Sequence, residues 1–206
     1  MGKRAERLPT WVENSLQGLA FWIGHRRALY PHYALGESAL IAEMSNLICA
    51  NLKGDEILLC ERPYSKLVPS GRWPDSPRTR ARADLVVVQG VRRSESTRQN
   101  SLYECVTTVI EVKRASAPES EIKSDLRRLS QVKQENPKVR AFLFLIAESR
   151  RPGRYVTQDG NAVPGTEVIT GTPSHYRVRR VCKAAASFGG QSRAHYSCII
   201  EVFNGD

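Results

Sequence analysis

Two apolar segments with carboxylates inside them constrain the fold of this chain more than any other feature. Residues 83–89 and 102–113 are rich in β-branched side chains and have the length of interior strands. Yet Asp84 stands near the start of the first segment, and Glu111 stands near the end of the second. A buried carboxylate costs several kcal/mol unless a partner compensates its charge. The sequence therefore predicts a shared partner for these two carboxylates at one edge of a β-sheet.

The apolar spacing and the prolines elsewhere in the chain predict an α/β order of elements. Helices are expected at residues 10–27, 36–52, 118–136 and 173–187. Further strands are expected at residues 56–60, 141–147, 167–170 and 195–203. The run at 141–147 follows a helix, which is typical of a buried parallel strand reached by a crossover. We expect a disordered basic tail at residues 1–9 and one domain over residues 10–206, with helices on both faces of a mixed central β-sheet.

The charge of the chain favours a polyanionic partner. Its 31 Lys and Arg residues outnumber its 21 Asp and Glu residues, which gives a net charge of +10. Phosphates neutralised by such a surface release counterions, and this release strengthens binding to nucleic acid. No apolar run approaches the roughly 20 residues of a membrane span, and no signal segment follows the basic N-terminus. Five cysteines without a CxxC motif indicate reduced core residues, so we expect a cytoplasmic protein with no membrane partner.

The strand periodicity places the two carboxylates and a lysine together. Side chains two residues apart in a strand share a face, so Glu111 and Lys113 project together. A hairpin connection at residues 90–101 would bring Asp84 beside Glu111. Two carboxylates and the carbonyl of Val112 are the oxygen ligands that Mg²⁺ prefers, with Mn²⁺ as a substitute. Lys113 could then orient an attacking water or stabilise a negative transition state.

The pattern Asp84…Glu111-Val112-Lys113, on two strands that precede a helix and an apolar strand, resembles the PD-(D/E)xK nuclease superfamily. The resemblance implies a restriction-endonuclease-like αβββαβ core, which residues 36–147 match in order. An N-terminal helix and a C-terminal α-β extension would flank this core. The sequence departs from the motif at Ala83, which stands where the family has proline, and in the long separation between the two acids.

Two other segments match parts of the motif, and we expect neither to form the site. The literal Pro74-Asp75 lies in a proline-rich loop with no strand after it. The second E-x-K pattern, Glu121-Ile122-Lys123, lies at the start of an expected helix, where acids stabilise the helix dipole.

The family often adds an acid from the helix before the sheet, and two residues are candidates for it. Glu37 falls close to the centre of the apolar stripe that contains Met44, whereas Glu43 falls at its edge. A carboxylate on a core-facing stripe needs a partner, so Glu37 is the preferred fourth catalytic residue. A first-turn helix acid is the alternative interpretation of Glu37.

Candidate DNA contacts are basic, aromatic or amide side chains near this site. They are Arg72, Trp73, Arg78 and Arg80 in the proline-rich loop, and Lys123 and Gln131 on the helix after the motif. Arg150, Arg151 and Arg154 in the loop at 149–165 are further candidates for lining a DNA groove.

The resemblance implies a divalent-metal-dependent deoxyribonuclease that hydrolyses phosphodiester bonds in double-stranded DNA, such as a restriction or phage-defence endonuclease. Cutting both strands requires two sites, so a homodimer or a partner subunit is expected. One alternative is a non-catalytic DNA-binding or partner-positioning subunit with a nuclease-like fold; it gains nothing from keeping buried charges. Another is an RNA-directed protein, which the aromatic content of 7% disfavours.

Overall fold

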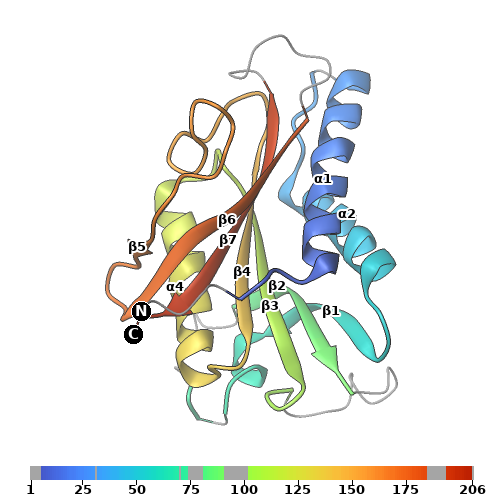
Figure 1. Cartoon of the computed structure of the whole chain (residues 1–206). Coiled ribbons are helices and arrows are strands. Elements are labelled where there is room, and N and C mark those ends of the chain that lie inside the picture. Colours follow the sequence, from blue (N-terminus) through green and yellow to red (C-terminus); the bar gives the residue numbers. More distant parts are fainter. Residues whose placement is uncertain are drawn as a thin grey trace.

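The α/β class expected from the apolar patterns is confirmed. The structure, a computed structural model, describes residues 6–30, 32–69, 71–73, 81–90, 102–184 and 194–205. In these ranges one mixed seven-stranded β-sheet is flanked by three helices (Figure 1). The helices are α1 (Thr10–Leu29), α2 (Glu37–Asn51) and α4 (Glu119–Glu135), and a short 3-10 helix η1 (Tyr64–Lys66) follows the first strand. The strands are β1 (Glu56–Pro63), β2 (Arg82–Gln89), β3 (Val106–Arg114), β4 (Arg140–Ala147), β5 (Glu167–Val168), β6 (Ser174–Ala184) and β7 (His195–Asn204).

The strands lie in the order β1-β2-β3-β4-β7-β6-β5 across the sheet. β3 and β4 run parallel, and the other neighbouring strands are antiparallel. The helix α4 makes the crossover between the two parallel strands, as the apolar run at 141–147 predicted. Apart from η1, the elements from α2 to β4 follow the α-β-β-β-α-β order expected for residues 36–147.

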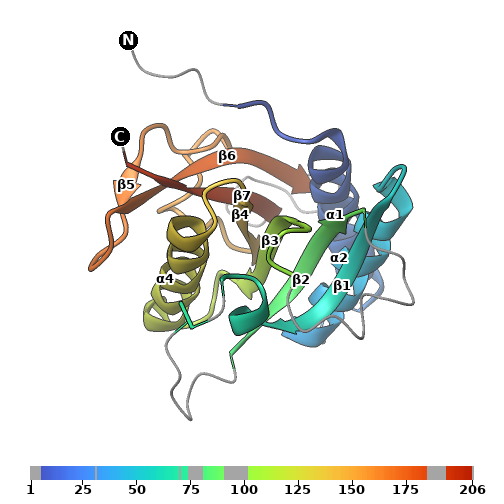
Figure 2. The same cartoon turned by 90° about the horizontal axis from the view of Figure 1, so that it is seen from below.

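Helices cover both faces of the sheet. Figure 2 shows α1 and α2 on one side and α4 on the other. Leu85, Ile110 and Phe144 pack toward α1 and α2, in one cluster of buried residues. Val86 and Val109 point the opposite way and pack with the buried face of α4. This alternation fixes the faces of β2 and β3, and it therefore decides on which side the acids of these strands project.

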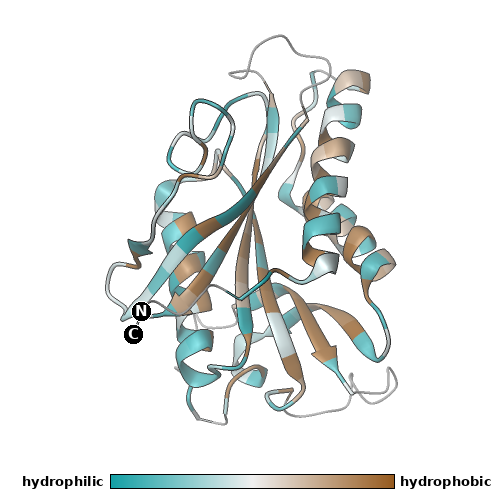
Figure 3. Ribbon diagram, viewed as in Figure 1, coloured by the Kyte–Doolittle hydropathy of each residue, from teal (hydrophilic) through white to brown (hydrophobic). Residues whose placement is uncertain are grey.

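The central strands are apolar on both faces, because both faces are covered. All residues of β4 from Ala141 to Ala147 are buried. A strand covered on both sides needs no polar alternation, so it becomes a continuous apolar run. In Figure 3 the central strands are accordingly brown over most of their length, while the helices alternate between brown and teal.

The expected C-terminal α-β extension is wrong, because residues 174–184 form the strand β6 rather than a helix. Tyr176 and Val178 belong to the core on one face of β6. Arg177 and Arg179 bond Glu201 of the neighbouring strand β7. The arginines resemble the polar side of a helix in sequence, but they serve a cross-strand charge cluster. The extension is therefore built from β5, β6 and β7.

The third strand is shorter than expected, and the chain before α1 lies against the sheet. β3 begins at Val106, because residues 103–105 form a turn. Leu8 is buried, and Arg140 donates a hydrogen bond of 2.8 Å to the carbonyl of Arg7. Residues 1–5 of the expected tail lie outside the described residues.

The cysteines are all free, but most are not core residues as expected. Cys49 and Cys60 are exposed, and only Cys198 is buried. No helix in the described ranges has the length and apolar composition needed to cross a membrane.

Candidate functional site

The hairpin of β2 and β3 brings Asp84 and Glu111 together. Leu85 pairs with Ile110 in this antiparallel ladder, so one further step along each strand places Asp84 opposite Glu111. The backbone N–H of Val112 donates a hydrogen bond of 2.7 Å to Asp84 Oδ2. Most of the connection between the strands, residues 91–101, lies outside the described residues, but the pairing of β2 with β3 meets the condition on which the expected site depends.

The two carboxyl groups are coupled, and the pKa of each is raised. Burial raises the pKa of Asp84. Glu111 is only 3% exposed, and its burial, together with the charges of Asp84 and Asp125, raises its pKa well above the usual value. The interaction between the two carboxyl groups lowers the pKa of Asp84 and raises that of Glu111 further. The pair therefore titrates as one coupled site, and a cation bound there would oppose the effect of burial on both acids.

Tyr64 and Arg128 cover Glu111. The hydroxyl of Tyr64 donates to Glu111 Oε1, and Arg128 Nε lies 3.6 Å from the same oxygen. Tyr64 is completely buried in the cluster beneath α4, where the phenol is held by the ring of Trp73 at 4.7 Å between centroids. The carboxyl of Glu111 is therefore oriented by one hydroxyl and one guanidinium, both outside the predicted motif.

The predicted DNA contact of Trp73 is contradicted by this packing. Trp73 is only 6% exposed and stacks in parallel on Tyr64, with 7° between the ring planes. By composition alone, a tryptophan in a proline-rich basic loop suggests a residue that lines a DNA groove. This tryptophan instead packs against Tyr64, the residue that donates a hydrogen bond to Glu111. Burial of its large ring explains the position without a ligand.

Lys113 is held between two acids from opposite sides of the sheet. Its Nζ lies 2.9 Å from Glu37 Oε1 on α2 and 3.5 Å from Asp125 Oδ2 on α4. Burial alone would lower the pKa of Lys113, but the hydrogen bond to Glu37 and the charge of Asp125 outweigh it, and the pKa is raised. The ammonium therefore stays charged and acts as a donor rather than a base.

Of the two helix acids considered from the sequence, Glu37 reaches the site. It is the first residue of α2 and is bonded to Lys113, with 38% of its side chain exposed. Glu43 lies two turns further along α2 and makes no hydrogen bond or ion pair with the described residues. The structure thus places Glu37 as a partner of the lysine, and its charge also contributes to the raised pKa of Asp84.

Sequence reasoning missed Asp125 and Arg128. Asp125 is 1% exposed on α4, and Arg128 donates to its Oδ1. Burial raises the pKa of Asp125, while the adjacent charges of Arg128 and Lys113 act to lower it. The sequence does carry a signal for Asp125, because this acid stands between Ile122 and Leu126 on the buried stripe of α4. It is a carboxylate among apolar neighbours, as Glu111 is.

The donor set fits a Mg²⁺ ion that keeps several waters. In the described part of the chain no group of three or more His, Cys, Asp and Glu side chains is arranged to hold a metal. Mg²⁺ needs no such group, because one or two carboxylates commonly bind it together with waters and substrate phosphates. Asp84 and Glu111 supply two carboxylates. The carbonyl of Val112 faces the same strand as its N–H, on the side of Asp84.

The predicted DNA contacts that the structure describes, besides Trp73, are spread along α4. Arg72 lies 4.0 Å from Glu135, at the end of α4, whereas Lys123 pairs with Glu119 in its first turn. Gln131 is partly exposed on the same helix. Arg78 and Arg80 lie outside the described residues.

Known proteins do not supply an interpretation of this site. Comparison with protein-family models, with curated proteins and with solved structures finds no match to the chain. The interpretation therefore rests on the contacts of Asp84, Glu111 and Lys113.

Proposed function

We propose that this chain is a divalent-metal-dependent deoxyribonuclease with a PD-(D/E)xK-like site. The observation that carries the proposal is the meeting of Asp84 with Glu111 across two strands, with Lys113 next to them at the end of β3. A sheet that only needed stability would place apolar side chains at these positions, because a buried charge cluster is often no more stable than apolar packing of the same volume.

The two acids would hold Mg²⁺ or Mn²⁺ with the Val112 carbonyl. The ion would supply Lewis-acid polarisation of a phosphate oxygen and lower the pKa of a water. The ion would favour the ionised form of Glu111, whose pKa is raised by burial and by the charges of Asp84 and Asp125. Tyr64, which donates to Glu111, and the fixed N–H of Val112, which donates to Asp84, orient one oxygen of each carboxylate.

Lys113 would stabilise negative charge on the phosphate that is cut. Its raised pKa keeps it protonated, so it cannot accept a proton from water near neutral pH. A preorganised cation at the developing charge is worth most where water is excluded, and the side chain of Lys113 is only 12% exposed. Glu37 and Asp125 fix the ammonium from two sides, which spares the entropy of ordering a long side chain in the transition state.

Plasmid cleavage tests this function. Wild type should convert supercoiled DNA to nicked and linear forms in Mg²⁺ or Mn²⁺, and linear product would require a homodimer or two encounters. Lys113→Ala should lose at least about a hundredfold in rate. Lys138→Ala is the matched control: this lysine is exposed before β4 and bonds none of the described residues. A wild type that cuts nothing, or a Lys113→Ala variant that cuts equally well, would reject the proposal.

A non-catalytic DNA-binding or partner-positioning subunit is the second candidate, and the burial of Glu111 favours it. Tyr64 and Arg128 close over this carboxylate, so an ion or phosphate reaches it only if they move. Such a subunit would bind duplex DNA without cutting it, and Asp84→Asn would leave its affinity unchanged. A nuclease would cut, and the same substitution would abolish cutting.

A further inference from the structure

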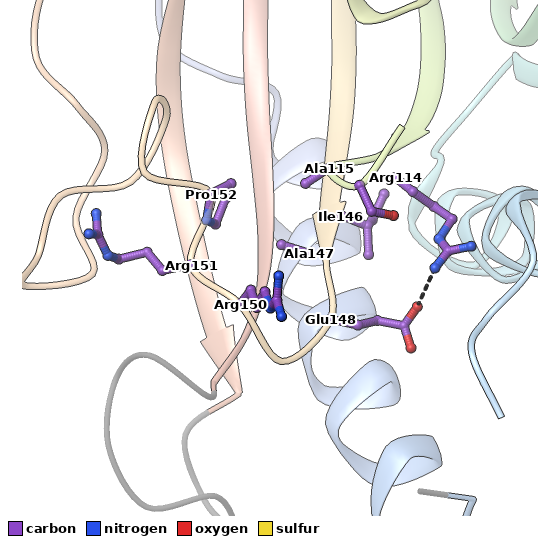
Figure 4. A pocket seen from close by; sticks show the side chains of 9 residues that line it. Arg114, Ala115, Ile146, Ala147, Glu148, Arg150, Arg151 and Pro152 are labelled. Carbon is purple, nitrogen blue, oxygen red and sulfur yellow. Dashed lines mark ion pairs between the residues drawn. The ribbon is translucent and has the colours of Figure 1, made fainter. Parts of the chain in front are cut away.

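A basic pocket lies beside the candidate site, at the carboxyl ends of the parallel strands β3 and β4. Its volume is about 450 Å³, and the chain after each strand contributes to its wall. Arg114 comes from the end of β3, and Glu148, Arg150 and Arg151 come from the loop after β4 (Figure 4). Loops at the carboxyl ends of neighbouring parallel strands are a common place for ligands in α/β proteins.

Positive charge exceeds negative charge around this pocket. Glu148 is the single acid among the described residues that line it, and it lies 3.7 Å from Arg114 and 3.9 Å from Arg27. Glu148 also accepts a hydrogen bond from the backbone N–H of Leu35. Three lining arginines against one glutamate leave two positive charges in excess. The pocket is therefore suited to an anion.

Arg150 is the guanidinium without a structural role. Its side chain is exposed and makes no hydrogen bond or ion pair with any described residue. In Figure 4 it lies between Arg151 and the ion pair of Glu148 with Arg114. Arg151, by contrast, donates to the carbonyl of Val156 and holds its own loop. Arg150 is thus free to meet a ligand, while Arg151 contributes charge from a fixed place.

The pocket is one residue away from the lysine of the candidate site. Arg114 follows Lys113 directly, so their Cα atoms are about 3.8 Å apart. Neighbouring residues of a strand project to opposite faces, and the two side chains therefore leave the carboxyl end of β3 on opposite faces of the sheet. A nucleic-acid strand with one phosphate at Lys113 would have a neighbouring phosphate within reach of Arg114 and Arg150.

We propose that this pocket binds a backbone phosphate next to the scissile bond of a nucleic-acid strand, an inference that rests on the proposed function. The planar guanidinium forms two parallel hydrogen bonds to a phosphate, so Arg114 and Arg150 can each hold two oxygens. Glu148 limits the affinity by holding Arg114 away from the ligand. The pocket positions the strand, and the reaction itself belongs to Asp84, Glu111 and Lys113.

Binding measured without metal tests the pocket independently of cleavage. Fluorescence anisotropy of a short labelled DNA duplex in EDTA gives the affinity at several salt concentrations. Arg150→Ala should bind roughly tenfold more weakly, as expected for one lost charge-assisted contact. The slope of log K against log salt should fall by about 0.9, the value for one phosphate contact. Lys138→Ala, with the same loss of charge at the other end of β4, should change neither quantity.

Glu148→Gln provides a second, opposite test. The amide keeps an oxygen for the N–H of Leu35 but releases Arg114 and Arg27 from their carboxylate. DNA should bind roughly tenfold more tightly. A merely structural role for Glu148 would instead weaken binding or lower stability.

The source of the phosphate follows from duplexes with and without a 5′-phosphate. If Arg150→Ala loses affinity equally for both duplexes, the pocket binds an internal phosphodiester. If it loses affinity only for the phosphorylated duplex, the pocket binds the phosphate at a strand end. The proposal would be overturned if Arg150→Ala kept the wild-type affinity and salt slope, or if the wild type bound neither duplex. The proposed function fails separately, when DNA is bound but not cut.

Discussion

Lys113 Nζ lies 2.9 Å from Glu37 Oε1, a contact that ties the end of β3 to the first residue of α2 across 76 positions of the sequence. Asp125 lies 3.5 Å from the same ammonium on the other side of the sheet. The lysine is therefore placed by both helical layers, and its position is expected to depend on each acid separately.

Loss of the Glu37 carboxylate should slow cleavage without removing it. Glu37→Gln takes away one charge from Lys113 while Asp125 remains. Removing a partner that orients a reacting group commonly costs about tenfold to a hundredfold in activity. The single-turnover rate on supercoiled DNA measures this loss. Glu43→Gln is the control on the same helix and should retain the wild-type rate; equal rates for both variants would remove Glu37 from the site.

Loss of the Asp125 carboxylate should destabilise the fold as well as the site. Asp125→Asn leaves Arg128 and Lys113, both partly buried, without the acid between them. Breaking such a pair costs about 2 to 3 kcal/mol when one partner is partly exposed. Urea unfolding should show this loss in the free energy of unfolding. Glu121→Gln, an exposed change about one turn earlier on α4, should cost less than about 0.5 kcal/mol.

Truncation of Trp73 should affect stability rather than DNA affinity. The ring is buried and stacks on Tyr64, so Trp73→Ala leaves a cavity worth about 3 to 5 kcal/mol. Urea unfolding measures the loss. In the remaining folded protein, DNA affinity should match wild type. Arg72→Ala changes the exposed residue before Trp73 and should leave stability unchanged. A Trp73→Ala variant that is fully stable but binds DNA poorly would instead support a direct DNA contact by Trp73.

The raised pKa values of Asp84 and Glu111 should make the metal-free protein less stable as pH rises. Burial raises the pKa of Asp84, and burial with the neighbouring acids raises the pKa of Glu111 well above its usual value. An acid whose pKa is raised by folding binds its proton more tightly in the folded state. Its contribution is therefore complete below the unfolded pKa, about 4, and is lost as pH rises through the folded pKa.

Urea unfolding in EDTA across this pH range measures the effect. The free energy of unfolding should fall above pH of about 4, by up to roughly 1.4 kcal/mol per pH unit for one proton. Glu111→Gln keeps the hydrogen-bonding shape and should remove most of this slope. Parallel curves for wild type and Glu111→Gln would show that the pair holds no extra proton.

The sheet and the meeting of its acids could be predicted because the signals are local. The apolar runs around Val86 and Phe144 have the length and composition of strands, and the strand period fixes which side chains share a face. The misplaced carboxylates Asp84 and Glu111 stood out only because their neighbours are apolar.

The remaining features depend on contacts that have no local signature. β6 is a strand because Arg177 and Arg179 meet Glu201 on β7, and its sequence alone resembles an amphipathic helix. Trp73 is buried because Tyr64 lies beneath it, a contact between a loop and a 3-10 helix. Asp125 could have been found, since it breaks the apolar stripe of α4 in the way that Glu111 breaks β3.

Calorimetric titration of Mg²⁺ tests the central claim, that Asp84 and Glu111 form a divalent-metal site. Wild type should bind the ion with release of protons, because Glu111 must ionise. Asp84→Asn should abolish this binding, whereas Asp55→Asn, an exposed acid bonded to Gln89 on the far part of the β1–β2 hairpin, should retain it. A wild type that binds no Mg²⁺ or Mn²⁺, or an Asp84→Asn variant that binds as well as wild type, would contradict the account.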